Sequence, residues 1–285
     1  MSVTRPGSES EQPPTTTIRP ASGWGFPDFR ELWMYRELIY FLVLRDIKVR
    51  YRQTILGGLW AVIQPLALAG VFTIVFGKVA GVPTEGVPYP LFAYTALVPW
   101  TLFSSVLSSS SGSLVGGANL VSKVYFPRII VPFASAASFL LDFAIGLALL
   151  AILLVFYGVV PPTPEILLLP FFSAMALLSA FAMGVWLSAL NVKYRDIRYA
   201  VPFLLQLLVF GSPLGYPVTE IQGPARILYA INPVTGIAEG FRWVVLGLDP
   251  PPAVFLIVPT IGTFVLLITG VLYFRRSERT FADLI

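Results

Sequence analysis

Residues 131–157 read VPFASAASFLLDFAIGLALLAILLVFY, in which Asp142 is the one charged side chain. A helix needs about 20 mostly apolar residues to cross the hydrocarbon core of a bilayer, and this stretch is longer than that. Because the core offers no water to backbone N–H and C=O groups, the structures that span it are helices and closed barrels. The stretch therefore predicts a transmembrane helix in an all-α integral membrane protein.

The rest of the chain has the same apolar character. It is 56% hydrophobic and 12% charged, whereas an ordinary soluble domain is roughly 25% charged. Six transmembrane helices are expected in all, and the other five are residues 57–78, 89–111, 166–190, 200–216 and 253–274. The 200–216 span contains Pro202 and Pro213 and borders Pro217, which predicts a kink or a break towards its end.

The distribution of Lys and Arg predicts how these spans are oriented. Short loops rich in basic residues stay on the cytoplasmic side of a membrane. Here such segments precede span one, follow spans two and four, and form the C-terminal tail. Both termini are therefore expected in the cytoplasm. Residues 1–28 are rich in Pro, Ser, Thr and Gly and are expected to be a disordered cytoplasmic tail, whereas residues 54–285 form the membrane domain.

Between these two parts, residues 29–53 mix apolar bulk with charge, and the apolar run at 38–44 is too short to span. We expect an amphipathic helix on the membrane surface. On a helix Arg45, Lys48 and Arg52 recur at i, i+3 and i+7, which gives one basic face suited to anionic lipid headgroups or a protein partner. The alternative is an anchor that only fixes topology.

The loop after span two, residues 117–132, reads GANLVSKVYFPRIIVP. Capping and proline residues favour a short helix across the cytoplasmic surface, and the Arg and aromatic side chains are types favoured at protein–protein contacts. The predicted docking residues are Asn119, Lys123, Tyr125, Phe126, Pro127 and Arg128. The alternative is a solvated turn whose charges only set topology.

The longest external connection, residues 217–252, contains apolar pieces too short to cross a membrane. These pieces predict short helices in the outer leaflet, and an external gate is plausible there with Pro217, Glu239 and Arg242 as members. The alternative is a re-entrant packing element that does not move.

Ionisable groups inside a span are costly, so Asp142 is a functional candidate by default. It could serve a proton-coupled transporter, or it could be neutral and hydrogen-bonded to Ser or Gln on another helix. Aromatic side chains of the first two spans could line a channel, where flat rings stack on sugar faces, or could face lipid. The channel candidates are Trp60, Phe72, Phe76, Trp100 and Phe103.

Residue types that the chain lacks exclude much chemistry. With no Cys and no His, disulfides, thiolate chemistry, imidazole metal sites and a His general base are excluded, and no metal or cofactor is expected on this chain. Isolated acids such as Glu85, Glu165 and Glu220 form no paired motif for an enzyme acting on lipid. The basic residues form no stripe for nucleic acid. The absence of a GxxxxGK[ST] loop means that another chain must power any ATP-driven step.

Five segments, in this order and at these spacings, carry a resemblance to a known family. They are LRDIKVRYRQTILGGLWAVIQPL (44–66), VPWTLFSS (98–105), NLVSKVYFPRIIVP (119–132), NVKYRDIRYAVPFLLQ (191–206) and INPVTGIAEGFRWVVLG (231–247). Residues 31–285 resemble the permease subunits of type-2 ABC exporters for O-antigen, teichoic acid and related lipid-linked glycans.

The resemblance implies a homodimer that forms a continuous channel in the bacterial inner membrane and is driven by two separate ABC subunits that bind ATP and Mg. It implies that residues 119–128 contain the coupling helix, that 29–53 is the interface helix, and that 217–248 holds the gate helices. The expected cargo is an undecaprenyl-pyrophosphate-linked polysaccharide such as O-antigen, with its pyrophosphate near Arg45, Lys48 and Arg52. Teichoic acid or galactan as cargo, and a proton-coupled transporter centred on Asp142, are the alternatives.

Overall fold

The structure is a computed structural model of the chain that describes residues 29–52, 57–162, 164–221 and 223–284. Within these ranges every regular element is a helix, as the all-α prediction requires. The predicted disordered tail, residues 1–28, lies outside the described residues, and so does Gln53 at the end of the predicted interface segment.

The α-helices follow one another as α1 (Phe29–Met34), α2 (Arg36–Tyr51), α3 (Trp60–Phe72), α4 (Tyr89–Gly116), α5 (Ala118–Lys123), α6 (Ile130–Ala137), α7 (Leu140–Tyr157), α8 (Leu169–Lys193), α9 (Ile197–Phe210), α10 (Ala225–Ile231), α11 (Pro233–Leu246) and α12 (Val254–Leu284). A π-helical stretch, Thr73–Val79, extends α3, and 3-10 turns at Gly57–Leu59, Glu165–Leu168 and Val218–Glu220 precede α3, α8 and α10.

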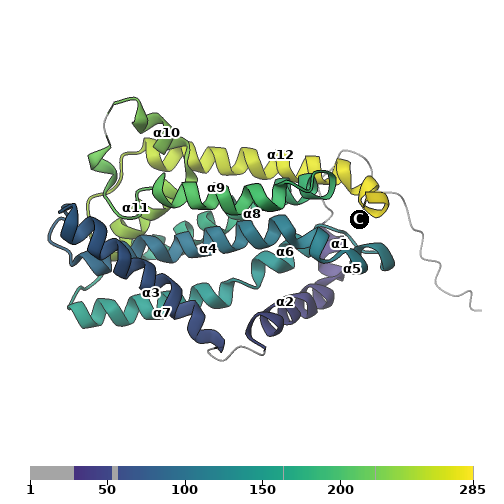
Figure 1. Cartoon of the computed structure of the whole chain (residues 1–285), viewed down its shortest axis with the longest axis horizontal. Coiled ribbons are helices and arrows are strands. Elements are labelled where there is room, and N and C mark those ends of the chain that lie inside the picture. The colour runs from purple at the N-terminus through teal and green to yellow at the C-terminus, as the bar shows by residue number, and fades with distance from the viewer. Residues whose placement is uncertain (1–28, 53–56, 163, 222, 285) are drawn as a thin grey trace, which may run out of the picture.

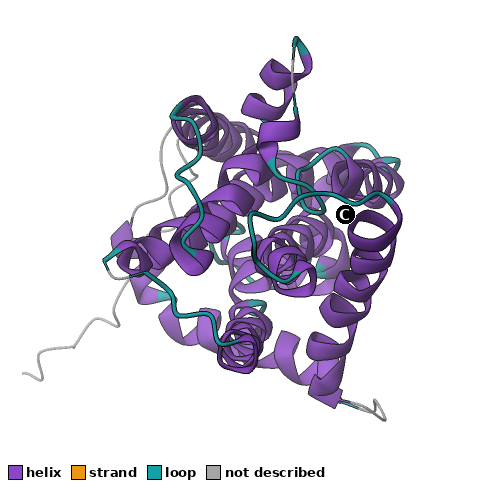
Figure 2. Cartoon of the chain, turned by 90° about the vertical axis from the view of Figure 1, so that its left-hand side faces the viewer, coloured by secondary structure: helices purple, strands orange, loops and turns teal. Residues whose placement is uncertain are grey.

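The long helices lie side by side along the longest axis of the molecule (Figure 1), and Figure 2 shows them end-on as a bundle. Helix α4 is at the centre and packs against α3, α6, α7, α8, α9 and α11. At one end of the bundle lie α1, α5 and the end of α12, while α10 and α11 lie at the opposite end. The predicted coupling and gate segments therefore lie at opposite ends of the bundle.

Five helical stretches are long and apolar enough to cross a membrane: Gly57–Val79, Tyr89–Gly116, Ile130–Tyr157, Glu165–Lys193 and Val254–Phe281. They overlap five of the six predicted spans. The remaining one, residues 200–216, corresponds to α9, whose 14 residues give a length of about 21 Å against a hydrocarbon core of about 30 Å. Residues 211–217 continue from it without helical structure, so the sixth span stays a prediction.

The Ile130–Tyr157 stretch bends between α6 and α7, at Ser138 and Phe139. There the backbone N–H of Phe139 donates to the carbonyl of Ala136, three residues back, at 3.2 Å, which is the tighter 3-10 pattern. The Ser138 hydroxyl also donates to the Ser135 carbonyl at 2.8 Å. The bend places Asp142 in the first turn of α7, beside the end of α2.

Close packing of α11 on the start of α12 depends on a glycine, and this gives a first testable prediction. A Cβ atom added to Gly236 would lie 1.9 Å from the Phe255 carbonyl oxygen, which is backbone and cannot turn aside. We expect Gly236→Ala to lower the free energy of unfolding by about 1–3 kcal/mol or more, as overpacked sites do. Denaturation with SDS in mixed micelles measures that change.

The matched control is Gly262→Ala in α12, where an added Cβ would meet nothing within 4 Å. Alanine favours helix more than glycine does, so this variant should be as stable as the parent or slightly more so. Equal stability of the two variants would contradict the close approach of α11 to α12.

Candidate functional site

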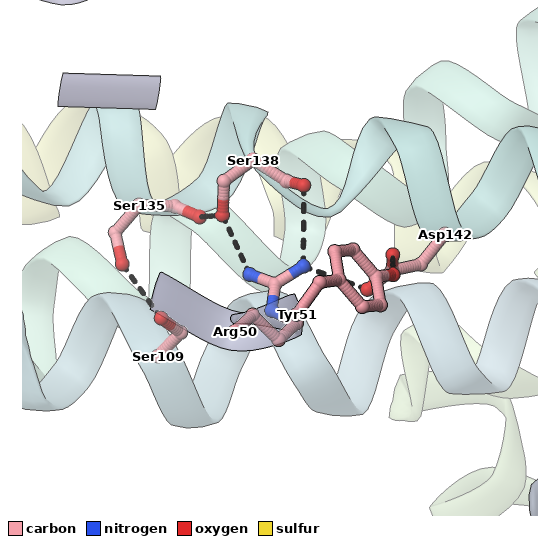
Figure 3. Close-up of polar contacts among 6 residues, drawn as sticks. All are labelled: Arg50, Tyr51, Ser109, Ser135, Ser138 and Asp142. Carbon is pink, nitrogen blue, oxygen red and sulfur yellow. Dashed lines mark hydrogen bonds and ion pairs between the residues drawn. The ribbon is translucent and has the colours of Figure 1, made fainter. Parts of the chain in front are cut away.

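An ion pair joins the end of α2 to the bend between α6 and α7. The Arg50 Nη1 donates to Asp142 Oδ2 at 2.7 Å and to the Ser138 carbonyl at 3.2 Å, and its Nη2 donates to Ser138 Oγ at 2.7 Å. Figure 3 shows the guanidinium between these groups. Its carbon lies 3.5 Å from the centroid of the Phe139 ring. The guanidinium is thus held by an acid, a hydroxyl, a carbonyl and an aromatic face.

Tyr51 adds a second donor to the same carboxylate, because its hydroxyl donates to Asp142 Oδ1. Burial, followed by the hydrogen bond and charge of Asp142, raises the pKa of Tyr51 to about 12. The phenol therefore keeps its proton at neutral pH and remains a donor to Asp142.

The sequence interpretation of Asp142 is incomplete in one respect. It offers Ser or Gln on another helix as hydrogen-bond partners of the acid, whereas the structure gives it Arg50 and Tyr51. Arg50 is left out of the predicted basic face because it does not share the spacing of Arg45, Lys48 and Arg52. An acid inside the membrane is costly without a partner. Arg50, a basic residue outside the predicted basic face, could therefore have been identified from the sequence as a candidate partner of Asp142.

Two hollows lie on either side of this ion pair. One, of about 250 Å³, lies between α3, α4 and α7 and includes Asp142, Phe139, Gln64 and Tyr94 in its lining. The other, of about 380 Å³, lies between α2, α4 and α6 and includes Arg50, Arg45 and Phe139. Phe139 lines both, so the ion pair and its supporting ring stand at the boundary between them.

Small and hydroxyl side chains of α4 face both hollows. Thr101, Ser104 and Ser105 line the first, and Ser109, Gly112, Ser113, Gly116 and Gly117 line the second. The Ser109 and Ser135 hydroxyls share a hydrogen bond of 2.6 Å, which Figure 3 shows beside Arg50. At the hollow between α2, α4 and α6, this face of α4 offers hydroxyl groups and little bulk, as a surface that contacts polar groups requires.

The predicted interface residues lie on the exposed side of α2 and just beyond its end. Arg45, Lys48 and Arg52 are all exposed, and Arg45 pairs with its neighbour Asp46 at 2.8 Å. The helix packs against α6, and the buried Leu42 anchors it in a second core cluster. Apolar side chains are exposed beside the basic ones, notably Tyr40, Phe41 and Val49. Exposed apolar and basic residues together suit a membrane interface.

The predicted coupling segment divides into an exposed and a buried part. Helix α5 is the expected short helix, and Asn119, Lys123 and Tyr125 are exposed. Phe126 and Pro127 are instead buried, and Phe126 joins the cluster that contains Leu42, Phe274 and Phe281. Only the first three of these residues are available to a partner.

Arg128, the last predicted docking residue, contacts the end of α12. Its backbone N–H donates to Glu278 Oε1 at 2.9 Å, and its guanidinium donates to the Glu278 carbonyl. The Glu278 carboxylate also lies 3.8 Å from Arg275. The coupling segment is therefore tied to the C-terminal helix through Arg128, and through Phe126 it joins the core cluster to which α2 contributes Leu42.

The predicted channel aromatics are mostly inside this chain. Phe72, Trp100 and Phe103 are buried, and Phe76 packs on Phe72 with 5.3 Å between ring centroids. Trp60 alone is exposed, at 46% of its surface. None of the five lines either hollow. Their channel role stays a prediction, and the polar groups of α4 are candidates that the sequence analysis missed.

The predicted gate residues form a buried polar cluster at the other end of the bundle. Arg242 of α11 is 1% exposed and pairs with Glu239 at 2.6 Å. It donates to the carbonyls of Pro213 at 2.8 Å, Leu214 at 2.7 Å and Tyr216 at 3.1 Å. Its guanidinium carbon lies 3.7 Å from the Phe92 ring centroid. Burial raises the pKa of the Glu239 carboxyl, and the charge of Arg242 opposes that rise.

These contacts are part of a set of hydrogen bonds to the carbonyls of the non-helical stretch after α9. The carbonyl of Gly211 accepts from Asn232, that of Ser212 from the Leu214 N–H, and that of Gly215 from the Tyr89 hydroxyl. Together with the three that Arg242 binds, every carbonyl from Gly211 to Tyr216 has a donor. Non-helical backbone at membrane depth is tolerated where protein satisfies it in this way. Pro217, the third predicted gate residue, is buried just beyond.

A family profile described as ABC-2 type transporter matches residues 37–246, from the first turn of α2 to the end of α11. The O-antigen export system permease protein RfbA of Myxococcus xanthus is 30% identical over 257 residues, which cover 89% of this chain and 97% of the relative. RfbA of Klebsiella pneumoniae is 25% identical over 253 residues, covering 87% and 95%. The polysialic acid transport protein KpsM of Escherichia coli is 23% identical over 237 residues, covering 83% and 92%.

Proposed function

The chain belongs to the ABC-2 type transporter family, and we propose that it is the permease subunit of an exporter that moves an undecaprenyl-pyrophosphate-linked polysaccharide across the bacterial inner membrane. The observation that carries this proposal is the near full-length similarity to permeases named for O-antigen export. A relative named for polysialic acid transport supports the broader class of cargo, a polysaccharide. We take O-antigen as the cargo ahead of teichoic acid or galactan.

In this proposal the chain is not an enzyme, and ATP and Mg are bound by two separate ABC subunits. These dock on the exposed residues of the coupling segment, Asn119, Lys123 and Tyr125. Movement then passes to α2 and α12 through the contacts of Phe126 and Arg128. A rigid connection of this kind is what a docked subunit needs to displace the membrane helices.

Two copies of the chain form the channel, with both termini in the cytoplasm. Such an orientation requires an even number of crossings, and we propose that α9 and residues 211–217 together make the sixth. Supporting this, α9 packs against α4 and α8 and runs along the bundle (Figure 1), and the carbonyls from Gly211 to Tyr216 are all hydrogen-bonded. The Arg242–Glu239 cluster then belongs to the external side, where α10 and α11 form the gate.

Deletion of the gene in its native host tests the cargo. We expect the lipid-linked polysaccharide to accumulate in the cytoplasmic leaflet and to disappear from the cell surface, and the full chain supplied in trans to restore it. Immunoblots of surface and spheroplast fractions measure both pools. Unchanged surface polysaccharide in the deletion strain would exclude this cargo.

The source of energy separates this proposal from a proton-coupled transporter centred on Asp142. Export into inverted vesicles should depend on added ATP and persist when a protonophore collapses the proton gradient. Export that stops with the protonophore and needs no ATP would favour the proton-coupled alternative.

A further inference from the structure

The ion pair between Arg50 and Asp142 is accessible rather than sealed. The two side chains are 25% and 22% exposed, and each lines a different hollow: Arg50 the one between α2, α4 and α6, and Asp142 the one between α3, α4 and α7. A ligand in the hollow between α2, α4 and α6 would meet the guanidinium without first meeting the carboxylate of Asp142.

The hollow between α2, α4 and α6 has the composition of an anion site. Two guanidinium groups, of Arg45 and Arg50, face it with one carboxylate, that of Asp46, which Arg45 already binds at 2.8 Å. The rest of the lining consists of the hydroxyl side chains Ser109, Ser113 and Ser135, the glycines at and just after the end of α4, and the apolar side chains Val49, Val131 and Phe139. Guanidinium groups match the geometry of phosphate oxygens in pairs, and small residues let a bulky headgroup approach.

Arg50 is prepared for an anion by its other contacts. The Phe139 ring supports one face of the guanidinium, and Ser138 holds Nη2 through its hydroxyl and Nη1 through its carbonyl. Asp142 therefore contributes only one of three hydrogen bonds to this group. If Arg50 turned to another anion, Asp142 would keep the hydrogen bond from Tyr51.

We propose that the hollow between α2, α4 and α6 binds the phosphate of a lipid-linked phosphate ester, that Arg50 is its principal ligand, and that Asp142 competes with this phosphate for Arg50. The choice of a lipid as the source rests on the proposed function, since the cargo is lipid-linked. The proposed phosphate site differs from the basic face of Arg45, Lys48 and Arg52 that the sequence predicts. It contains Arg45 and Arg50, and neither Lys48 nor Arg52 lines it.

Competition between Asp142 and the phosphate for Arg50 predicts an effect on binding affinity that a purely structural ion pair would not have. Removing the charge of Asp142 releases Arg50 to the phosphate and should tighten binding, whereas removing the charge of Arg50 should weaken it. If the pair only braced α2 against α7, both substitutions would act in the same direction.

The experiment measures binding of farnesyl diphosphate to the full chain, purified with its associated subunits in nanodiscs of zwitterionic lipid. We expect Arg50→Gln to raise Kd at least tenfold and Asp142→Asn to lower it at least threefold. Arg36→Gln is the matched control, because Arg36 lies exposed on the same helix and lines neither hollow. Its Kd should equal that of the parent.

Two further probes identify the source of the phosphate. Farnesol, which lacks phosphate, should bind at least tenfold more weakly, and so should inorganic pyrophosphate, which lacks the lipid. Equal affinity for farnesol would overturn the role of phosphate, and equal affinity for inorganic pyrophosphate would overturn the lipid source.

Weaker binding by Asp142→Asn would overturn the competition and leave a structural brace. If either inner variant fails to fold, as judged by gel filtration, Arg45→Gln decides, because Arg45 is half exposed and its loss leaves the inner pair intact. A several-fold rise in its Kd supports the site, and an unchanged Kd overturns it. None of these measurements depends on transport. If the variants keep their ATPase partners and their Kd values equal that of the parent, the phosphate site is rejected while the proposed exporter function stands.

Discussion

Replacing Arg242 by methionine is expected to lower the free energy of unfolding by about 3–5 kcal/mol, as breaking a buried ion pair does. The substitution leaves Glu239, whose side chain is 12% exposed, without its charged partner and removes the donor to the Pro213, Leu214 and Tyr216 carbonyls. A buried polar group without a partner costs its full desolvation. Titration with SDS in mixed micelles measures the change.

Arg226→Met is the matched control for this effect. Arg226 lies at the same end of the bundle, on α10, but its side chain is exposed, and exposed substitutions change stability by about 0.5 kcal/mol or less. Arg242→Lys should fall between the two, because one ammonium does not reproduce the fork of a guanidinium. Equal stability of Arg242→Met and Arg226→Met would contradict the role assigned to Arg242.

The second large effect concerns the docking of the ATP-binding subunit. We expect the double substitution Lys123→Ala with Tyr125→Ala to reduce the amount of copurifying ATPase at least tenfold, since a single interface hot spot is worth about 2 kcal/mol or more. Both side chains are exposed, Tyr125 at 61% of its surface, so the stability of the permease should not change. Quantitative mass spectrometry of the purified complex gives the ratio of subunits.

Two other variants make this result specific. Phe126→Ala should cost about 3–5 kcal/mol of stability, as truncation of a buried Phe does, so loss of the partner there would not report on docking. Lys193→Ala with Tyr194→Ala removes the same residue types from the end of α8 and the loop that follows it, where both are also exposed. An equal loss of ATPase in this control would contradict docking at the coupling segment.

The positions of the spans could be predicted from the sequence because hydropathy is a local property. Five of the six predicted stretches coincide with long apolar helices. The bend at Ser138 and the early end of α9 depend on hydrogen bonds to other elements, and hydropathy does not report these. Prolines at 202, 213 and 217 indicated a break in the right place but not what stabilises it.

The roles of individual charged residues were harder to predict, because they depend on contacts far apart in the sequence. Glu239 and Arg242 were assigned to one external segment, yet nothing local indicated that Arg242 binds the backbone after α9. Phe126 is of a residue type that is common at docking surfaces, but in the structure it is buried in the core. Arg50 was not predicted as a functional residue, because helical spacing shows which residues share a face of α2 but not which residues of other helices that face contacts.

Affinity purification of the tagged chain from membranes of its native host, with identification of the bound subunits and an ATPase assay, tests whether a separate ATP-binding subunit drives this permease. We predict a P-loop ATPase in equal stoichiometry with the chain and ATP hydrolysis by the complex. A pure chain without an ATP-binding partner, still able to export its cargo, would contradict a permease driven by a separate ABC subunit.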